Sequence, residues 1–505
     1  MASDGSALKK APVDLNTYQI ERKALEIIPV AVARKYNVIP LAISGDTLLV
    51  GMAETDVLAF QELASIAKMR IAPVLADPEQ IRQYIDSNYR AYAEIQKQFK
   101  DVPAYAQTAA ATVPVEDIVN APVVRALDLI MSEAVKMRAS DIHLEPQADR
   151  LRVRYRIDGM LHDTMSLPMA AHALLVSRIK VMGNMNIADH KPQDGQLTVR
   201  VQDKDVDVRV ATLNTLYGEM CSLRILDKSF ASRALPDLGF AVTMLRQYQS
   251  MLQSPLGMIL VSGPTGSGKT TTLYASINTL DRKGRKIVTV EDPVEYRFDG
   301  IDQIQVSPKA GLTFASGLRS IMRHDPDVIM VGEIRDGDTA AIATQSALTG
   351  QLVLSSIHAN DTVGTLFRLR DLGIGQYLIS ATLIGVVSQR MVRRVCPHCR
   401  RLTKAPIDAE MAYASEMGEG RKEFYYGRGC NACANTGYLG RVAIAEIMVV
   451  DHELRSAMLS GANADELRQV ARKQGMVSMW RDGMTKAGEG ITTPSEVVRN
   501  ILFTG

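Results

Sequence analysis

Short apolar runs alternate with helical patterns through the second half of the chain. Four such runs predict strands, at residues 258–262, 287–290, 328–331 and 352–356. Unbroken apolar runs are typical of strands that are buried on both faces, and their alternation with helices indicates a mostly parallel sheet. The sequence therefore predicts a doubly wound α/β domain, whose chemistry is expected beyond the carboxyl ends of the strands.

A strict alternation of apolar and polar residues marks a different domain. Along residues 151–157 the apolar side chains face one way, and Arg152, Arg154 and Arg156 face the other way. This period of two predicts a half-buried strand, and we interpret its arginine face as a solvated surface. Helices are expected at 123–137 and 174–182 and further strands at 197–201, 206–212 and 220–226, which together make an α+β domain.

The N-terminal part carries a third, smaller set of elements. Its pattern predicts helices at 24–36, 56–67 and 78–89 and strands at 47–52 and 69–75, a small α/β domain. No catalytic constellation occurs there, so a docking or protein-interaction module is the default interpretation, with a nucleotide-sensing role as the alternative. Residues 97–121 contain Ala, Thr, Pro and Gln with little periodicity and are predicted to form a linker.

Length and pattern together predict a multidomain α/β protein. A chain of 505 residues is too long for one core. The expected parts are a disordered tail at 1–14, an N-terminal docking domain at 15–96, the linker at 97–121, a second N-terminal domain at 122–233 and a C-terminal domain at 234–505, which includes a cysteine-rich subdomain at 393–440 and C-terminal helices at 451–505.

Composition narrows the class of protein. Hydrophobic residues make up 46% and charged residues 23% of the chain, and the net charge of +2 gives no global basic field, so direct nucleic-acid binding is not expected. No apolar run approaches the roughly 18 residues of a membrane span, and the N-terminus has no apolar signal core. We therefore expect a cytoplasmic protein whose contact with a membrane is peripheral or made through a partner.

The strongest motif follows the first predicted strand of the C-terminal domain. The segment consists of Gly263, Pro264, Thr265, Gly266, Ser267, Gly268, Lys269 and Thr270, with a helical pattern from Thr271. Strand, glycine-rich loop and helix start are the context of a phosphate-binding loop. Glycines let backbone N–H groups approach the phosphates, and the helix N-terminus adds partial positive charge. Lys269 is expected to reach the β- and γ-phosphates, and the Thr270 hydroxyl to hold Mg²⁺.

Carboxylates follow the next two predicted strands. Glu291, Asp292 and Glu295 lie close together, and their repulsion is costly unless a cation or a proton-transfer role compensates. One of them can orient the attacking water and another can help to hold Mg²⁺, whereas a plain acidic loop is the alternative. Glu333 ends the following strand, where a carboxylate is expected to contact Mg²⁺ through water.

Titratable and cationic side chains complete the candidate site. His358 follows the fourth strand and is either structural, a sensor of the γ-phosphate or a link to a neighbouring subunit. Arg319 and Arg323 lie four apart on one face of a predicted helix, from which they pair with acids or reach a phosphate. Arg209 and Arg224 belong to the α+β domain and act as arginine fingers if that domain closes over a nucleotide.

Four of the five cysteines form two pairs with the same spacing. Cys396 and Cys399 precede the segment 400–429, and Cys430 and Cys433 follow it. Four thiolates at such spacing suit tetrahedral Zn²⁺ and leave no position open for catalysis. Disulfides are the alternative and are disfavoured in a cytoplasmic protein, and the near-neutral chain argues against a zinc ribbon that binds nucleic acid.

These motifs resemble those of the type II secretion and type IV pilus assembly ATPases, a branch of the secretion ATPase superfamily. The resemblance covers roughly residues 120–500, through GPTGSGKTTTLY, EDPVE, IMVGEIRD and SSIHAND in the C-terminal domain and SDIHLEP, RYRIDG and KPQDGQ in the second domain. CPHC and CNAC resemble the zinc subdomain of the assembly branch. Together with a separate N-terminal domain, they favour extension or secretion over retraction.

The resemblance implies a RecA-like phosphate-loop ATPase domain preceded by a PAS-like α+β domain. It gives Glu295 the role of catalytic base and places Glu333 on Mg²⁺, and by the same likeness the four arginines act across or within a subunit interface. The implied function is a homo-hexameric motor with ATP, Mg²⁺ and Zn²⁺, which assembles pilin-like subunits through an inner-membrane platform protein. Residues 15–92 are expected to dock on the cytoplasmic part of a membrane partner.

Two other functions stay open at this point. One is a nucleotide switch or ring scaffold that barely hydrolyses, which the carboxylates disfavour. The other is a motor that handles DNA in uptake or conjugation, since such systems use related rings. Some relatives bind cyclic di-GMP through an N-terminal domain with an Arg-Leu-Gly start, and because residues 18–34 lack this triplet, that ligand is not expected.

Overall fold

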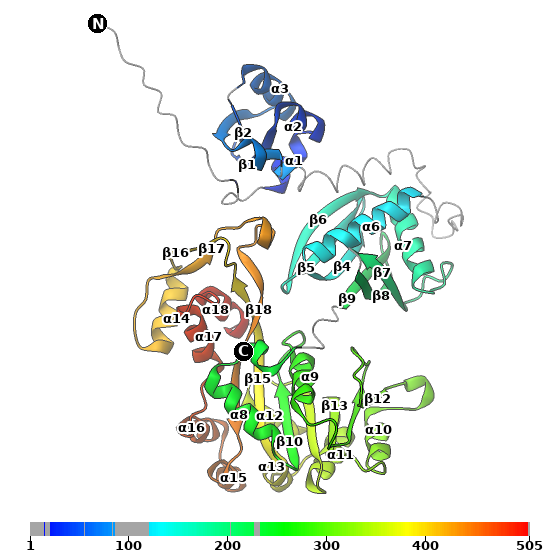
Figure 1. Cartoon of the computed structure of the whole chain (residues 1–505), viewed down its shortest axis with the longest axis vertical. Helices are drawn as coiled ribbons and strands as arrows, with labels where there is room; N and C mark the ends of the chain where they lie inside the picture. Colours follow the sequence, from blue (N-terminus) through cyan, green and yellow to red (C-terminus); the bar gives the residue numbers. More distant parts are fainter. Residues whose placement is uncertain are drawn as a thin grey trace. The chain divides into compact units, whose positions relative to one another are not determined.

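The computed structural model describes Leu15 and residues 21–54, 56–82, 84–85, 121–201, 204–226 and 233–502. The tail predicted at 1–14 lies outside these residues, as does the predicted linker except for Ala121. The chain divides into two compact units: Met1–Asp227 with Cys396–Arg400 and Gly427–Leu439, and Lys228–Val395 with Arg401–Tyr426 and Gly440–Gly505. Figure 1 shows the helices and strands of the chain, coloured from the N-terminus to the C-terminus. Among the described helices, none has the length and apolar character needed to cross a membrane.

The first unit begins with a small α/β domain. Its described elements are α1 Arg22–Ile27, α2 Val30–Tyr36, β1 Val38–Ser44, β2 Thr47–Met52, α3 Val57–Ala67 and β3 Arg70–Leu75. The prediction of one helix at 24–36 is wrong, because Pro29 separates α1 from α2 with extended backbone. The sequence did not reveal β1, whose register shifts beside Pro40. Of the helix predicted at 78–89, residues 78–82 and 84–85 are helical, and the rest lies outside the described residues.

The second domain of this unit is an antiparallel sheet covered by two helices. Its elements are α6 Ala121–Lys136, β4 Ala139–Pro146, β5 Arg150–Ile157, β6 Met160–Pro168, α7 Ala170–Met182, β7 Gln193–Val201, β8 Lys204–Thr215 and β9 Gly218–Leu226. The strand order is β6-β5-β4-β9-β8-β7, with every neighbouring pair antiparallel. Apolar side chains of α6, α7 and one face of this sheet form a single core, as the alternation along β5 predicts.

The other face of β5 is partly exposed, in keeping with the surface expected from the sequence, and its arginines are also paired. Arg152 donates to both carboxylate oxygens of Asp163, at 2.6 and 2.7 Å. Arg154 pairs with Glu145, and Arg156 lies 3.8 Å from Asp141. Carboxylates on β4 and β6 thus pair with the arginines of β5. Asp141 stands directly opposite Arg156, whereas Glu145 and Asp163 lie diagonally across from the arginines that they bind.

The second unit is built on one large sheet. Its elements are η3 Leu235–Leu238, α8 Val242–Leu252, β10 Gly257–Ser262, α9 Lys269–Thr279, β11 Ile287–Glu291, β12 Asp302–Gln305, η4 Pro308–Ala310, α10 Phe314–Ile321, β13 Val328–Ile334, α11 Gly337–Leu348, β14 Leu352–Ile357, α12 Thr362–Asp371, α13 Gln376–Thr382, β15 Leu383–Val395 and β18 Tyr438–Val449. The order is β12-β11-β13-β14-β10-β15-β18, and β12 through β15 run parallel. The four strands predicted from apolar runs all lie in this sheet.

Both faces of the large sheet are covered, as predicted for a doubly wound fold. Along β10, Met258 and Leu260 pack into one core with residues of α10, α11, α12, α15 (His452–Leu459) and α16 (Ala464–Lys473). Ile259 and Val261 pack into a second core with residues of α8 and α9. The alternation of side chains along a strand divides them between the two layers. The multidomain α/β class expected from the sequence is confirmed.

The remaining elements follow β15 in the chain. They are β16 Arg400–Lys404, α14 Ile407–Met417, β17 Glu423–Gly427 and η5 Asn431–Cys433, then α15 His452–Leu459, α16 Ala464–Lys473, α17 Met479–Gly488 and α18 Pro494–Leu502 after β18. The C-terminal region is helical as predicted, and Ser478 caps the start of α17.

Candidate active site

The phosphate loop joins β10 to α9 with a backbone that only glycine adopts readily. Gly263, Gly266 and Gly268 have φ values of +144°, +78° and +88°. At Gly263 a Cβ atom would stand 2.4 Å from the carbonyl oxygen of Gln389, so this glycine is required by close packing as well as by its φ. The loop N–H groups and the first turn of α9 together form a site suited to phosphate oxygens.

The polar side chains of the loop fit such a ligand. Lys269 folds back over the loop, and its Nζ donates to Gly263 O at 2.9 Å and to Pro264 O at 3.1 Å. Burial lowers the pKa of Lys269, and the nearby Glu333 carboxylate opposes that shift. The buried Ser267 hydroxyl finds no hydrogen-bond partner among the described residues, while Thr270 is exposed in the first turn of α9.

Two neighbouring strands bring further charged groups to the same edge of the sheet. On β13 the Glu333 carboxylate is hydrogen-bonded by Arg335, and it lies 3.6 Å from Nε2 of His358, just past the end of β14. Burial lowers the pKa of His358, and the charge of Lys269 lowers it further, so its imidazole is neutral at neutral pH. The structure therefore brings together Lys269, Glu333 and His358, as expected from their places after parallel strands.

The acidic segment after β11 is divided between the core and the surface. The sequence analysis placed Glu291 after the strand. In the structure it is the last residue of β11, and it is 3% exposed. Its carboxylate accepts hydrogen bonds from the hydroxyl of Tyr274, from Thr289 Oγ1 at 2.6 Å and from Gln303 Nε2 at 3.0 Å. With its oxygens used inside the protein, Glu291 supports the segment that follows it.

Asp292 and Glu295 remain nearer the surface. Asp292 is exposed, and its charge contributes to the raised pKa of Arg335, after the hydrogen bond from Arg335 to Glu333. The backbone N–H of Glu295 donates to the Tyr274 hydroxyl at 3.2 Å. Tyr274 lies on α9, so one side chain links the helix of the phosphate loop to the segment that holds the predicted base. The roles of Asp292 and Glu295 stay predictions.

The four predicted arginines occupy two different units. The expectation that Arg319 and Arg323 share a helix is wrong, because α10 ends at Ile321 and Arg323 follows its C-cap. Both of these side chains are exposed. Arg209 and Arg224 stand opposite each other on β8 and β9 of the first unit, and Arg224 Nε donates to Asp141 at 3.0 Å. Their proposed action on a nucleotide stays a prediction.

Three side chains of this region were missed by the sequence analysis: Arg335, Tyr274 and Gln389. Arg335 could have been found, because it follows Glu333 by two residues, just past the end of β13 at Ile334. Tyr274 lies within the phosphate-loop motif but was read only as part of a helix. Gln389 is 122 positions from its partner Ser267, and no local pattern points to it.

The four paired cysteines form a compact cluster in the first unit. Their Sγ atoms lie within 4.8 Å of one another, with Cys396–Cys430 at 3.8 Å, Cys399–Cys433 at 3.9 Å and Cys430–Cys433 at 3.7 Å. Sulfurs at about 2.3 Å from a tetrahedral Zn²⁺ are about 3.8 Å apart, whereas a disulfide needs about 2.05 Å. The donor set thus fits Zn²⁺ and not two disulfides.

Glycines hold the two halves of this cluster together. Gly427 and Gly437 approach so closely that a Cβ on Gly427 would lie 1.9 Å from the carbonyl oxygen of Gly437. Backbone N–H groups of Cys396 and Arg428 donate to Gly437 O and Cys399 O, at 3.0 and 3.2 Å. This backbone frame fixes the spacing between the pairs, which the sequence left undetermined.

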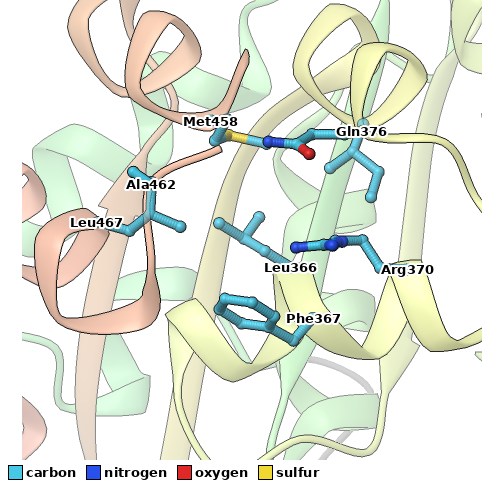
Figure 2. A pocket seen from close by; sticks show the side chains of 8 residues that line it. Leu366, Phe367, Arg370, Gln376, Met458, Ala462 and Leu467 are labelled. Atoms are coloured by element: carbon cyan, nitrogen blue, oxygen red, sulfur yellow. The ribbon is translucent and has the colours of Figure 1, made fainter. Parts of the chain in front are cut away.

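A separate hollow in the second unit lies among helices (Figure 2). Its lining comes from α12, α13, the α15–α16 corner and α16, and consists of Leu366, Phe367, Arg370, Gln376, Ile379, Met458, Ala462 and Leu467. In Figure 2 the Arg370 guanidinium and the Gln376 amide are the polar groups of an otherwise apolar wall. None of the predicted site residues line this hollow, so it is distinct from the phosphate loop.

Comparisons with known families cover most of the chain. Residues 116–499 match the family model described as "Type II/IV secretion system protein", and residues 8–94 match the "MshEN domain". The first match spans both the antiparallel sheet and the large sheet.

Individual relatives agree with these families. "Type II secretion system protein E" of Klebsiella pneumoniae is 41% identical over 488 residues, covering 95% of this chain and 97% of that protein. "Type IV pilus assembly ATPase PilB" of Thermus thermophilus is 40% identical over 486 residues, covering 94% of this chain and 54% of that protein. The solved structure of the Legionella pneumophila ATPase DotB has 22% identity and a TM-score of 0.57, covers 75% of this chain and 95% of that one, and supports the fold alone.

Proposed function

The chain belongs to the type II/IV secretion system protein family and is an ATPase, and we propose that it is the motor that assembles pilin-like subunits through an inner-membrane platform protein. The observation that carries the proposal is the convergence of Lys269, Glu333 and His358 at one edge of the large sheet. Relatives named for type II secretion and for type IV pilus assembly both match this chain. The proposed motor function therefore has two versions, pseudopilus assembly and pilus extension.

The proposed roles follow the geometry of the loop and strand ends. N–H groups between Gly263 and Thr271 bind the phosphates of ATP, and Lys269 turns from its loop carbonyls toward the β- and γ-phosphates. Thr270 and Glu333 hold Mg²⁺, which when bound neutralises charge on the phosphate oxygens. Glu295 accepts a proton from the attacking water. Asp292 contributes negative charge beside Arg335.

The proposal extends to assembly and location. We propose a homo-hexamer at the cytoplasmic face of a bacterial inner membrane, with Arg209, Arg224, Arg319 and Arg323 supplying positive charge within or across its subunit interfaces. Residues 15–92 would dock on the cytoplasmic part of a membrane partner. Family membership supports these assignments. Sedimentation of the full chain with and without ATP tests the hexamer, and a stable monomer under both conditions contradicts it.

Glu295→Gln tests the proposed chemistry. The amide keeps the shape of the side chain but takes no proton, so we expect ATP to bind with near-normal affinity while phosphate release falls about 100-fold or more. Asp299→Asn is the matched control, because Asp299 is exposed four residues further along. Binding is followed with a fluorescent nucleotide and turnover by phosphate release. Normal turnover in Glu295→Gln shows that another group is the base.

We propose Zn²⁺ as the ion of the cysteine cluster, on the strength of the sulfur–sulfur distances. Zinc content of purified protein should be about one ion per chain and should disappear when Cys396, Cys399, Cys430 and Cys433 are all changed to Ser. Cys221→Ala is the control, since Cys221 is 1% exposed in the core of the antiparallel sheet. Zinc that persists without the four thiols contradicts the assignment.

A further inference from the structure

Strand β15 lies beside β10 and continues past the point where β10 gives way to the phosphate loop. In the parallel register Ser388 stands opposite Ser262, the last residue of β10. Gln389 is therefore level with the start of the loop, and it is 1% exposed. A polar side chain buried at this level needs hydrogen-bond partners, and the loop supplies them.

The amide of Gln389 contacts both the loop and the helix that follows it. Its Nε2 donates to the carbonyl oxygen of Ser267 at 2.7 Å. Its Oε1 accepts from the Thr272 hydroxyl at 2.8 Å, and Thr272 lies in the first turn of α9, with its N–H bonded to Gly268 O at 3.0 Å. One side chain thus ties the last part of the loop to the start of the helix.

This contact fixes the direction of a phosphate-binding N–H group. In a trans peptide the carbonyl oxygen and the N–H of the next residue point in opposite directions. When Gln389 Nε2 donates to Ser267 O, the N–H of Gly268 in the same peptide must point away from the Gln389 amide. Gly268 has φ +88°, and glycine allows many other backbone conformations at this position. The hydrogen bond from Gln389 is therefore needed to hold the peptide in one of them.

We propose that Gln389 is a positioning residue that holds the phosphate loop in its binding conformation before ATP arrives. This inference rests on the proposed ATP-binding role of the loop. It adds strand β15, which carries Gln389, to the parts of the protein that shape the ATP site. Because a loop held in advance loses less conformational freedom on binding, Gln389 acts on nucleotide affinity more than on the chemical step. Removal of its two hydrogen bonds should weaken ATP binding roughly 5- to 100-fold.

The main test compares two substitutions of Gln389. Gln389→Met keeps the length of the side chain and removes both hydrogen bonds, so ATP affinity should fall at every pH. The carboxyl group introduced by Gln389→Glu still accepts from Thr272 but donates to Ser267 O only when protonated. Relative to wild type, the affinity of Gln389→Glu should therefore improve as pH falls, whereas that of Gln389→Met should not.

Thr272→Val tests the second hydrogen bond, with Thr272→Ser as the conservative rescue. Combined with Gln389→Met, Thr272→Val should cost less than the sum of the two single losses, because the residues share one contact. Ser388→Ala is the control on the same strand, since its buried hydroxyl has no partner in the described part of the chain. It should bind ATP as wild type does.

The readouts separate positioning from simple support of the fold. ATP dissociation constants are measured on the full chain below its melting transition, together with the melting temperature. A variant that melts earlier but binds ATP normally overturns the inference, as does identical pH dependence in Gln389→Met and Gln389→Glu. If Gln389→Met fails to fold, Gln389→Glu and Thr272→Val decide. If Lys269→Ala binds and hydrolyses ATP normally, the proposed function itself is wrong.

Discussion

The antiparallel sheet of residues 139–226 and the large sheet of residues 257–449 place their charges differently. On the antiparallel sheet, arginines of β5 pair with carboxylates of the neighbouring strands β4 and β6. On the large sheet, β10 and β14 are buried throughout, and Lys269, Glu333 and His358 lie at or just past the carboxyl ends of strands.

The difference teaches which charges are available to a ligand. Across β4, β5 and β6 the antiparallel pairing places opposite charges beside one another, and they neutralise one another. Parallel strands that are covered on both sides favour exposed polar groups at their ends, and Lys269, Glu333 and His358 lie together there. Charge on these three antiparallel strands is paired within its domain, whereas charge at the strand ends of the large sheet lies where we propose that ATP binds.

The largest expected effect comes from removing a charged group at the carboxyl ends of the strands in the large sheet. Lys269→Ala should reduce ATP hydrolysis at least about 100-fold, because a charge aimed at the phosphates is lost. The melting temperature should change little, since within the described part of the chain the hydrogen bonds of Lys269 go to carbonyl groups of its own loop. Phosphate release and thermal melting measure the two effects.

A lysine at the opposite edge of the same sheet is the control. Lys286 is exposed just before β11, and Lys286→Ala should hydrolyse ATP normally. If Lys269→Ala unfolds the second unit, the charge of Lys269 stabilises the fold, which contradicts the proposal that it serves mainly to bind ATP.

The next effect concerns a buried ion pair of the antiparallel domain. Lys180 on α7 is 1% exposed, and its Nζ lies 2.7 Å from Glu219 on β9 and donates to Asp189 O at 2.8 Å. Lys180→Met leaves the Glu219 carboxylate buried without its charge partner, which should destabilise this domain by about 3–5 kcal/mol. Urea unfolding gives the size of the loss, and hydrogen exchange of β9 amides gives its location.

Arg152→Met is the comparison on the exposed face of that sheet. Its bidentate pair with Asp163 is half exposed, so the loss should be at most about 1 kcal/mol. Equal losses in the free energy of unfolding for Lys180→Met and Arg152→Met would mean that burial does not determine how much an ion pair stabilises this domain.

The smallest effect is a pH dependence of the same domain. Burial lowers the pKa of His172, whose Nε2–H donates to Glu219 O at 2.8 Å. A histidine with a lowered pKa in the folded state binds its proton more readily when unfolded. Stability should therefore be complete above about pH 6.5 and should be lost as pH falls from there through the folded pKa.

His172→Gln should flatten this loss, because the amide does not titrate. Hydrogen exchange of β8 and β9 amides between pH 7.5 and about pH 5 measures the slope. The same slope in wild type and variant would assign the pH dependence to other groups, such as His143, whose pKa burial also lowers.

Contiguous patterns were enough to predict β10, β11, β13 and β14 of the large sheet and the phosphate loop, but not β12, β15 or β18. The predicted strands are apolar runs, and the loop is one segment with a fixed order of residues, whereas β15 carries Gln389 and three arginines. The strands β4 and β6 were missed because many of their outward residues are polar partners of the arginines, which weakens the apolar signal.

Side-chain direction was harder to predict than strand position. Glu291 and Glu333 both lie near strand ends, yet Glu291 turns inward because Tyr274, Thr289 and Gln303 surround it. Gln389 reaches the loop from a strand more than a hundred positions away, and no spacing rule connects the two. The sequence thus located the site, while contacts between distant segments determine how its groups are held.

The division of β10 between two apolar layers has a consequence for how the second unit unfolds. Met258 and Leu260 belong to one layer and Ile259 and Val261 to the other, so neither set of helices can detach without exposing alternate residues of the same strand. Melting of the two layers is therefore cooperative, and a cavity introduced on one side of β10 weakens the attachment of helices on both sides.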